Sequence, residues 1–295
     1  MKIGVLKETG NDARVSFLPG NIKKLSESNI TFLVESGAGE GVYFSDQDYK
    51  NAGANILSNS KLTSEADILL RINPFTADEI RNYDNKKVLI SMFNPLSNTE
   101  IVKAAKEKGV TLLSLDMIPR ITRAQTMDVL SSMATVAGYK AVLDAANHLD
   151  GFFPMFMTAA GTIKPANVMI LGAGVAGLQA IATARRLGAV VEVFDVRSAA
   201  KEDVQSLGAK FIEVEGAVES KDAGGYAVEQ TEEFKKKQKQ LVHDHAIKAR
   251  VIITTAQIPG KKAPLLVTKE TVEQMRSGSV IVDLAASSGG NCELT

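Results

Sequence analysis

Short apolar runs alternate with longer polar and amphipathic stretches along most of the chain. In the first 120 residues, runs typical of buried strands are separated by segments typical of helices, which predicts a parallel sheet covered by helices. The expected strands are 2–6, 31–35, 68–71, 88–92 and 111–116, and the expected helices are 19–28 and 98–108.

A second series of apolar runs begins at residue 168 and predicts a second parallel sheet. Its expected strands are 168–171, 190–194, 210–214, 251–255 and 280–284. Residues 127–148 are rich in Ala, Ser and Gly, which allow close packing, and they predict a long helix that bridges the two sheets. We therefore expect an α/β fold of two Rossmann-like, doubly wound parallel-sheet domains, 1–126 and 127–295, with the bridging helix in the second.

The end of the 168–171 run carries a glycine pattern, followed by a helix-forming segment and by an apolar run that ends in Asp195. This order is the fingerprint of dinucleotide binding. Gly172 permits the tight turn, Gly174 lets the backbone approach a pyrophosphate, and Gly177 lets the helix pack closely on the strand. Asp195 follows Gly177 by eighteen residues and is expected to accept hydrogen bonds from the adenosine ribose. The alternative is a glycine-rich turn that binds no ligand.

Asp195 and Arg197 favour different cofactors. A carboxylate at this point repels the 2′-phosphate of NADP, whereas an arginine just after the strand can receive it. Because Asp195 stands at the strand end itself, we expect NAD(H), with NADP as the alternative.

Two further loops bear on nucleotide binding. The stretch 37–41 is rich in glycine but lacks the last glycine of the fingerprint, so we expect a loop and a first domain without its own nucleotide. The polar stretch from Glu215 to about Gln240 holds Gly224 and Gly225 beside Tyr226. Such a segment is typical of a hinged lid that excludes water from a reactive site, and a surface loop is the alternative.

Polar side chains also gather around the start of the predicted bridging helix. Arg120, Arg123 and Gln125 precede it, while Asp128 and Ser131, with the neighbouring Ser132, share one helix face. They are arranged to form a polar rim at a cleft between domains, where cofactors commonly bind. The alternative is local: Thr122 and Gln125 match a capping box, and Asp128 suits the helix dipole.

Composition excludes several classes of function. Lys+Arg and Asp+Glu both number 34, so the formal net charge is zero and nothing indicates nucleic acid as a partner. The single cysteine, Cys292, excludes an internal disulfide and fits a reducing compartment.

We expect Cys292 to be a small packed residue, the lysine-rich run 235–239 to be a solvated helix face, and His243-x-His245 to be solvated rather than a metal site. No apolar run approaches the roughly 18–20 residues that span a bilayer. The last predicted strand has no closing helix, so we expect the domain to continue past Thr295.

Several of these runs together resemble one family, the NAD(H)-binding component of proton-translocating nicotinamide nucleotide transhydrogenases. The resemblance covers essentially the whole chain. It rests on the runs 119–132, 159–162, 172–178, 195–197, 224–226, 254–261 and 289–292.

The resemblance implies roles for individual residues. Arg120, Gln125, Asp128 and Ser131 would surround the nicotinamide, with Gln125 reaching toward the cofactor of a partner, and Tyr226 would lie on a loop that closes over bound nucleotide. Further residues would line the NAD site: Ile121, Thr122, Arg123, Thr126, Met127, Ala173, Val175, Ala176, Val196, Arg197, Gly225, Gln238, Thr255, Ala256 and Gln257. Gln257 departs from the leucine that the family usually has there, so its role is not carried over.

The resemblance also implies an activity and partners. The chain would bind NADH and pass a hydride to NADP⁺ held on a separate NADP(H)-binding domain, with transfer coupled to proton movement through a membrane domain. It implies a homodimer on the cytoplasmic face of a membrane complex.

The nearest enzymatic relative of this family is alanine dehydrogenase, which handles pyruvate with an arginine, a lysine, a histidine and an aspartate. Arg14 matches the arginine, but the histidine position falls near Phe93 and the aspartate position at Ser287. Reduction of an imine or ketone needs a nearby proton donor, whereas hydride exchange between two nicotinamides needs only that their C4 atoms meet in a dry site. We therefore expect a transhydrogenase component, with an amino-acid dehydrogenase or a non-catalytic NAD-binding module as alternatives.

Overall fold

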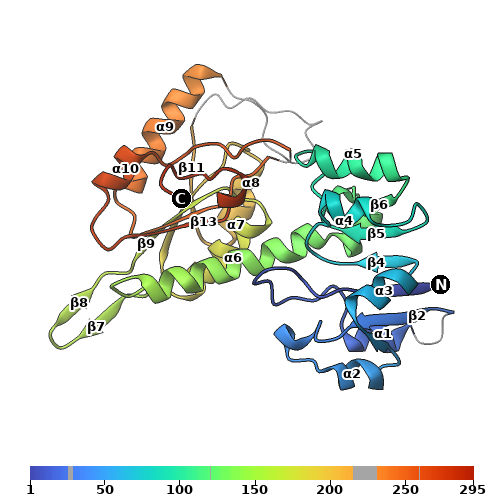
Figure 1. The fold of residues 1–295 in the computed structure, drawn as a ribbon. Helices are drawn as coiled ribbons and strands as arrows, with labels where there is room; N and C mark the ends of the chain where they lie inside the picture. Colours follow the sequence, from blue (N-terminus) through green and yellow to red (C-terminus); the bar gives the residue numbers. More distant parts are fainter. Residues whose placement is uncertain (26–28, 120, 215–230, 259) are drawn as a thin grey trace. The chain divides into compact units, whose positions relative to one another are not determined.

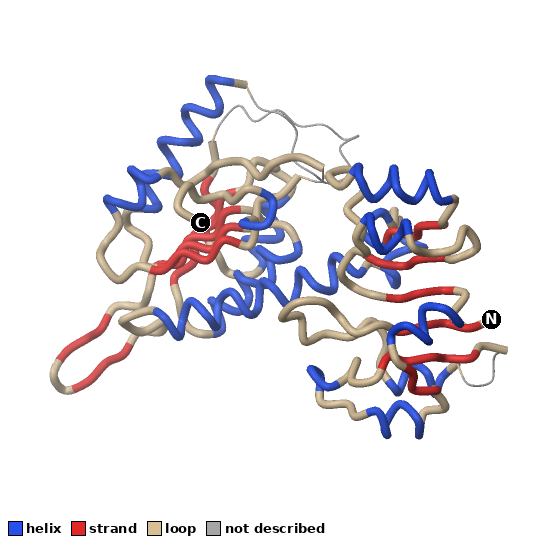
Figure 2. Tube along the Cα trace, in the orientation of Figure 1, coloured by secondary structure: helices blue, strands red, loops and turns tan. Residues whose placement is uncertain are grey.

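The computed structural model describes residues 1–25, 29–119, 121–214, 231–258 and 260–295. The chain divides into two compact units, Met1–Val129 and Leu130–Thr295, called unit 1 and unit 2 below. Each unit has a parallel sheet with helices packed on both faces (Figures 1 and 2). The predicted α/β class with two Rossmann-like parallel sheets is therefore confirmed.

Unit 1 holds a six-stranded sheet in the order β3-β2-β1-β4-β5-β6. Its strands are β1 (Lys2–Val5), β2 (Thr31–Glu35), β3 (Asn55–Leu57), β4 (Ile68–Leu70), β5 (Val88–Ser91) and β6 (Thr111–Ser114). Its helices are α1 (Pro19–Lys24), α2 (Asp46–Asn51), α3 (Asn59–Glu65), α4 (Ala77–Arg81) and α5 (Thr99–Lys108), with the 3₁₀ turns η1 (Glu40–Val42), η2 (Leu115–Met117) and η3 (Thr122–Met127).

The alternation of side chains along β2 explains why helices cover both faces of this sheet. Phe32 and Val34 pack in one buried cluster with side chains of α1 and α2, whereas Leu33 packs in another with side chains of α3, α4 and α5. Successive strand residues point to opposite faces, so an apolar run without polar interruption indicates a sheet buried on both sides.

Unit 2 holds a five-stranded parallel sheet in the order β11-β10-β9-β12-β13 and an antiparallel hairpin of β7 and β8. Its strands are β7 (Phe156–Thr158), β8 (Gly161–Ile163), β9 (Asn167–Leu171), β10 (Val190–Phe194), β11 (Lys210–Ile212), β12 (Val251–Thr254) and β13 (Val280–Asp283). Its helices are α6 (Val129–His148), which begins at the last residue of unit 1, α7 (Val175–Arg186), α8 (Ala200–Ser206), α9 (Glu232–Ala246), α10 (Lys269–Gln274) and the 3₁₀ turn η5 (Ala286–Ser288).

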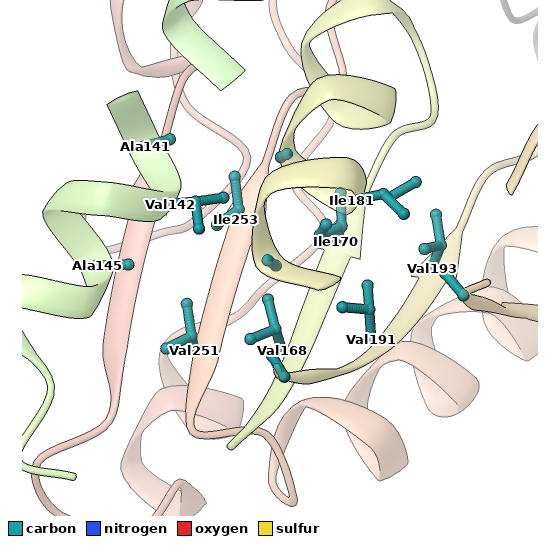
Figure 3. Close-up of a cluster of buried hydrophobic side chains, with 14 of the residues drawn as sticks. Ala141, Val142, Ala145, Val168, Ile170, Ile181, Val191, Val193, Val251 and Ile253 are labelled. Carbon is teal, nitrogen blue, oxygen red and sulfur yellow. The ribbon is translucent and has the colours of Figure 1, made fainter. Parts of the chain in front are cut away.

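The core of unit 2 is likewise divided between two faces. On one face, alternate residues of β9, β10 and β12 meet α6 and α7, as Figure 3 shows for Val168, Ile170, Val191, Val193, Val251, Ile253, Ala141, Val142, Ala145 and Ile181. On the other face, Met169 and Leu171 pack with Val242 and Ala246 of α9. The strand order reverses between β9 and β12, and ligands of such sheets bind beyond the carboxyl ends of the strands at this point.

Glycine is required where β9 passes into α7. Gly172 adopts a φ of +104°, in the left-handed region that favours glycine. A Cβ at Gly177 would overlap the carbonyl oxygen of Gly172, and a Cβ at Gly138 of α6 would overlap the carbonyl oxygen of Ala176. The turn is therefore packed tightly between the strand and two helices.

Several elements are missing from the sequence-based expectation. The expected ranges do not include β3, the short helices α2, α3, α4, α8 and α10, or the β7–β8 hairpin, which projects from unit 2 (Figure 1). The hairpin presents its side chains to solvent on both strands. It therefore lacks the alternation of buried and exposed residues that reveals a strand in a sequence.

No helix in the described ranges is both long enough and apolar enough to cross a bilayer.

Replacing Gly138 with alanine is expected to destabilise unit 2 by about 1–3 kcal/mol, because the added methyl group has no space in the packed contact. Hydrogen exchange of the amides in α6 and β9 measures this loss. Gly20→Ala in α1 is the matched control, since a Cβ there meets no heavy atom within 4 Å. Unchanged protection of α6 and β9 in Gly138→Ala would contradict the tight contact.

Candidate functional site

Three segments of unit 2 meet at the carboxyl edge of its sheet. The glycine turn 172–177 follows β9, the segment 195–197 follows β10, and the segment 255–257 follows β12. The N-cap of α7 is Gly174, which has no side chain to cap the first helical amides. A helix start of this kind binds anions through its N–H groups and dipole.

Asp195 links the glycine turn to the end of β10. Its buried carboxylate accepts a hydrogen bond from the backbone N–H of Ala173 at 2.7 Å and another from the backbone N–H of Arg197 at 2.9 Å. The guanidinium of Arg197 also donates hydrogen bonds to both carboxylate oxygens of Asp195, with Nε 2.9 Å from Oδ1 and Nη2 2.8 Å from Oδ2. These hydrogen bonds, which Asp195 accepts, raise the pKa of Arg197 above its ordinary value. The two side chains that favoured different cofactors in the sequence therefore form one bidentate ion pair.

The segment after β12 braces the same turn. The hydroxyl of Thr255 donates to the carbonyl oxygen of Gly172 at 3.1 Å. The side-chain amide of Gln257 donates to the carbonyl oxygen of Leu284 at 3.1 Å, so this residue, which departs from the family pattern, is engaged with the backbone after β13.

Asp283 and Asn291 organise this edge, although the sequence did not single them out as site residues. The Asp283 carboxylate accepts hydrogen bonds from Thr254, Ala285, Asn291, Cys292 and Thr295. Burial opposes its ionisation, but the hydrogen bonds outweigh burial and hold the pKa of Asp283 below its ordinary value. The sequence does contain a signal for Asp283, because this acidic residue comes at the end of an apolar run, as Asp195 does.

The polar residues around residue 125 lie in η3 and at the start of α6. Thr122, Arg123, Gln125 and Thr126 are exposed, as are the apolar Ile121 and Met127, while Ala124 of the same turn is buried. The N-cap of η3 is Ile121, whose side chain makes no capping hydrogen bond, so the alternative in which Thr122 caps a helix was wrong. Asp128 and Ser131 are half-buried at the two sides of the helix start. Arg120 lies outside the described residues.

The predicted lid falls partly outside the described residues, which exclude Gly225 and Tyr226. The last part of the predicted polar stretch, from Glu232 to about Gln240, lies in α9, where Gln238 is half-buried. The lysines of α9 form ion pairs between Lys235 and Glu232 and between Lys237 and Glu233 on an exposed face, as expected for a solvated helix.

The remaining candidates have structural roles. His243 bonds to Thr271 and His245 to Glu192, so these histidines are half-buried and hydrogen-bonded rather than freely solvated, which corrects the prediction. Cys292 is a free, buried cysteine whose pKa is raised by burial, as expected for a packed residue. Over the described stretches of the chain, no group of His, Cys, Asp and Glu side chains is arranged to hold a metal ion.

Arg14, the residue that the resemblance matched to an arginine of alanine dehydrogenase, lines a cavity of about 290 Å³ in unit 1. Its guanidinium is already bound by Asp12, with Nε 2.9 Å from Oδ1 and Nη2 2.6 Å from Oδ2. The hydrogen bond from Arg14 holds the pKa of Asp12 far below its usual range. Asn73 donates to both Asp12 and the buried Glu8, so two carboxylates stand beside this arginine.

Comparison with known proteins agrees with this geometry. The family model for the alanine dehydrogenase/PNT N-terminal domain matches residues 4–137, and that for the alanine dehydrogenase/PNT C-terminal domain matches residues 141–295. The first part of NAD(P) transhydrogenase subunit alpha from Rhodospirillum rubrum is 47% identical over 305 aligned residues, which cover 100% of this chain and 79% of that protein. Alanine dehydrogenase of Bacillus subtilis is 30% identical, over 99% of this chain and 72% of that protein.

A solved structure of transhydrogenase from Sinorhizobium meliloti superposes with a TM-score of 0.86 at 44% identity, covering 99% of this chain and 81% of that chain. One assignment thus follows from the matches to both halves of the sequence, from the two parallel sheets, and from the glycine turn with its acidic partner Asp195. The chain belongs to the alanine dehydrogenase/PNT family.

Proposed function

We propose that this chain is the NAD(H)-binding component of a proton-translocating transhydrogenase, presenting NADH for direct hydride transfer to NADP⁺ on a partner domain. The observation that carries the proposal is the glycine turn and the Asp195–Arg197 pair at the point where the strand order reverses. The similarity to a transhydrogenase alpha subunit over the whole chain supports it.

The residues of the turn fit a dinucleotide. A Cβ at Gly174 would meet no heavy atom within 4 Å, so this part of the turn is open to a pyrophosphate. The uncapped start of α7 offers N–H groups to the phosphates. The backbone of the turn is held in place by the bond from Ala173 to Asp195 and by the hydroxyl of Thr255.

The Asp195–Arg197 pair favours NAD(H) over NADP(H). Asp195 neutralises the arginine that would otherwise attract a 2′-phosphate, and its own charge repels that phosphate. The ribose hydroxyls of NAD(H) would instead donate to the carboxylate of Asp195, in place of one of the two bonds that it accepts from the guanidinium of Arg197, and such a bond is charge-assisted.

At the reactive end, NADH supplies a hydride from C4 of its dihydronicotinamide. The C4–H bond of NADH breaks as a C4–H bond forms on NADP⁺, and no proton is gained or lost. We assign Arg120, Asp128 and Ser131 to positioning the nicotinamide, and Gln125, which is exposed, to the side that meets the partner's cofactor. Ile121, Thr122, Arg123, Thr126 and Met127 would line the approach.

Two observations disfavour an amino-acid dehydrogenase. Phe93, near the position of that enzyme's histidine, is 1% exposed within the core of unit 1 and offers no proton. Arg14 is already paired with Asp12, and the carboxylate of Glu8 lies close enough to favour the charge of Arg14. To bind Arg14, the carboxylate of a substrate would have to displace the carboxylate of Asp12 and approach that of Glu8.

The proposal includes an assembly on the cytoplasmic face of a membrane, in which the partners are an NADP(H)-binding domain, a membrane proton channel and a second copy of this chain. The β7–β8 hairpin supports the second copy, because Met155, Phe156, Met157 and Ile163 all expose between 43% and 75% of their surface. Apolar surface gathered in this way commonly marks a protein interface.

Hydride transfer from NADH to NADP⁺ tests the proposal when measured with and without a purified NADP(H)-binding transhydrogenase domain. Transfer is expected only with that domain. Oxidation of L-alanine by NAD⁺ is run in parallel and is expected to be absent. Alanine oxidation would establish the dehydrogenase instead, and NADH binding without transfer to the supplied domain would establish a non-catalytic module.

Asp195→Ala is expected to weaken NADH binding by about 1–3 kcal/mol, because the ribose hydroxyls lose a charged acceptor. NADPH binding is expected to strengthen, since Arg197 is released from its ion pair. Titration calorimetry with both cofactors measures the two changes. Glu213→Ala, which removes an exposed carboxylate just after β11, is the control. An unchanged dissociation constant for NADH in Asp195→Ala would refute the role of Asp195.

Gln125→Asn is expected to leave NADH binding nearly intact and to slow transfer to the partner domain, because the shorter side chain misplaces a contact in a geometry that tolerates little displacement. Stopped-flow transfer rates and NADH titration separate the two effects. Gln240→Asn on the exposed face of α9 is the matched control. Equal losses of binding and transfer would indicate that Gln125 is an ordinary pocket residue.

A further inference from the structure

Asn291 is a fully buried polar residue in the segment after β13, with 0% of its surface exposed. Its Oδ1 accepts a hydrogen bond from the backbone N–H of Ala256 at 3.0 Å. Its Nδ2 donates to the carbonyl oxygens of Ala256 at 2.9 Å and of Pro264 at 2.8 Å. Both donors and the acceptor of the amide are therefore used, as a buried amide requires.

These three bonds close a loop. Ala256 lies two residues after the end of β12, and Pro264 lies near the return of the chain toward α10. The side chain of Asn291 thus holds the backbone of Ala256 and that of Pro264 next to each other. Because the single backbone N–H of Ala256 donates to Asn291, that N–H is not available to a ligand.

Asn291 is itself held by the end of β13. The Asp283 carboxylate accepts from the backbone N–H of Asn291 at 2.7 Å and from the hydroxyl of Thr254, the last residue of β12, at 2.8 Å. The ends of β12 and β13 and the side chain of Asn291 therefore form one connected network of hydrogen bonds.

This network lies on one side of the point where the strand order reverses. A dinucleotide binds across that point, with one mononucleotide half over each half of the sheet. Asp195 follows β10 on the β9–β10 side, which takes the adenosine half. The loop that Asn291 closes follows β12 on the opposite side, which takes the nicotinamide half.

We propose that Asn291 is a positioning residue that sets Thr255 and Ala256, and with them Pro264, against the nicotinamide half of NAD(H). The inference rests on the proposed function and adds to it a residue that touches no cofactor. Without the amide, Ala256 and Pro264 lose their common partner, and three backbone groups lose a hydrogen bond. The loop then departs from the position in which Thr255 braces the glycine turn.

Binding of NADH and of ADP to wild type, Asn291→Ala and Asn291→Asp tests the proposal. ADP carries the adenosine half and the pyrophosphate but no nicotinamide. Both variants are expected to weaken NADH by about tenfold or more and to change ADP by less than about twofold. Asn291→Asp is nearly isosteric, but its carboxylate would face two carbonyl oxygens that need donors.

Thr271→Val is the matched control, because Thr271 is a buried hydroxyl of the same unit that bonds to His243 and Thr268 away from the loop. It is expected to change stability without changing the ratio of the two affinities. All titrations are made well below the melting temperature of each variant, which is measured first.

Parallel weakening of ADP and NADH in the Asn291 variants would show a general structural role and overturn the positioning role. Unchanged NADH affinity in Asn291→Asp would also overturn it, because the two donors would then be dispensable. Failure of the wild-type chain to bind NADH would overturn the proposed function itself, and the inference with it.

Discussion

The contact between the backbone of β9 and the first turn of α7 constrains the loops at the carboxyl edge of the sheet in unit 2. The helix starts so close to the strand that residue 177 has no room for a side chain against the carbonyl of Gly172, and α6 approaches the same turn through Gly138. Close packing of this kind leaves the start of α7 pointing at the space beyond the strand ends. Steric packing alone therefore fixes the direction of the α7 dipole and of the N–H groups in its first turn.

Two carboxylates then organise the loops around this turn in similar ways. Asp195 directly follows β10 and Asp283 is the last residue of β13, and each accepts hydrogen bonds from backbone N–H groups of residues that follow its strand. Each also holds one partner, Arg197 in the first case and Asn291 in the second. The first arrangement holds a carboxylate and a guanidinium beside the glycine turn, and the second holds the backbone of Ala256 and Pro264. In the proposed function, the first lies on the adenosine side of a dinucleotide and the second on the nicotinamide side.

Much of this edge was predictable from the sequence because its signals are local. Residues 31–35 and 190–194 were predicted at their observed bounds, since their apolar runs are buried on both faces. The glycines and Asp195 follow from spacing alone. The hairpin and β3 escaped prediction because β7 and β8 bury no face and β3 is only three residues long. Asn291 escaped because its partners, Ala256 and Pro264, are 35 and 27 residues away in the chain, and no local pattern reports such contacts. Asp195 and Arg197 are close neighbours in the sequence, and only the structure shows that their side chains form an ion pair.

The most direct test of the account follows the transferred hydrogen itself. NADH carrying deuterium at the transferred position of C4 is mixed with NADP⁺, this chain and an NADP(H)-binding transhydrogenase domain in ordinary water, and the NADPH formed is analysed by mass spectrometry. Direct transfer between two nicotinamides predicts that the deuterium is retained at C4 of NADPH. Appearance of solvent hydrogen at that carbon would contradict direct transfer between the two nicotinamides in a site that excludes water.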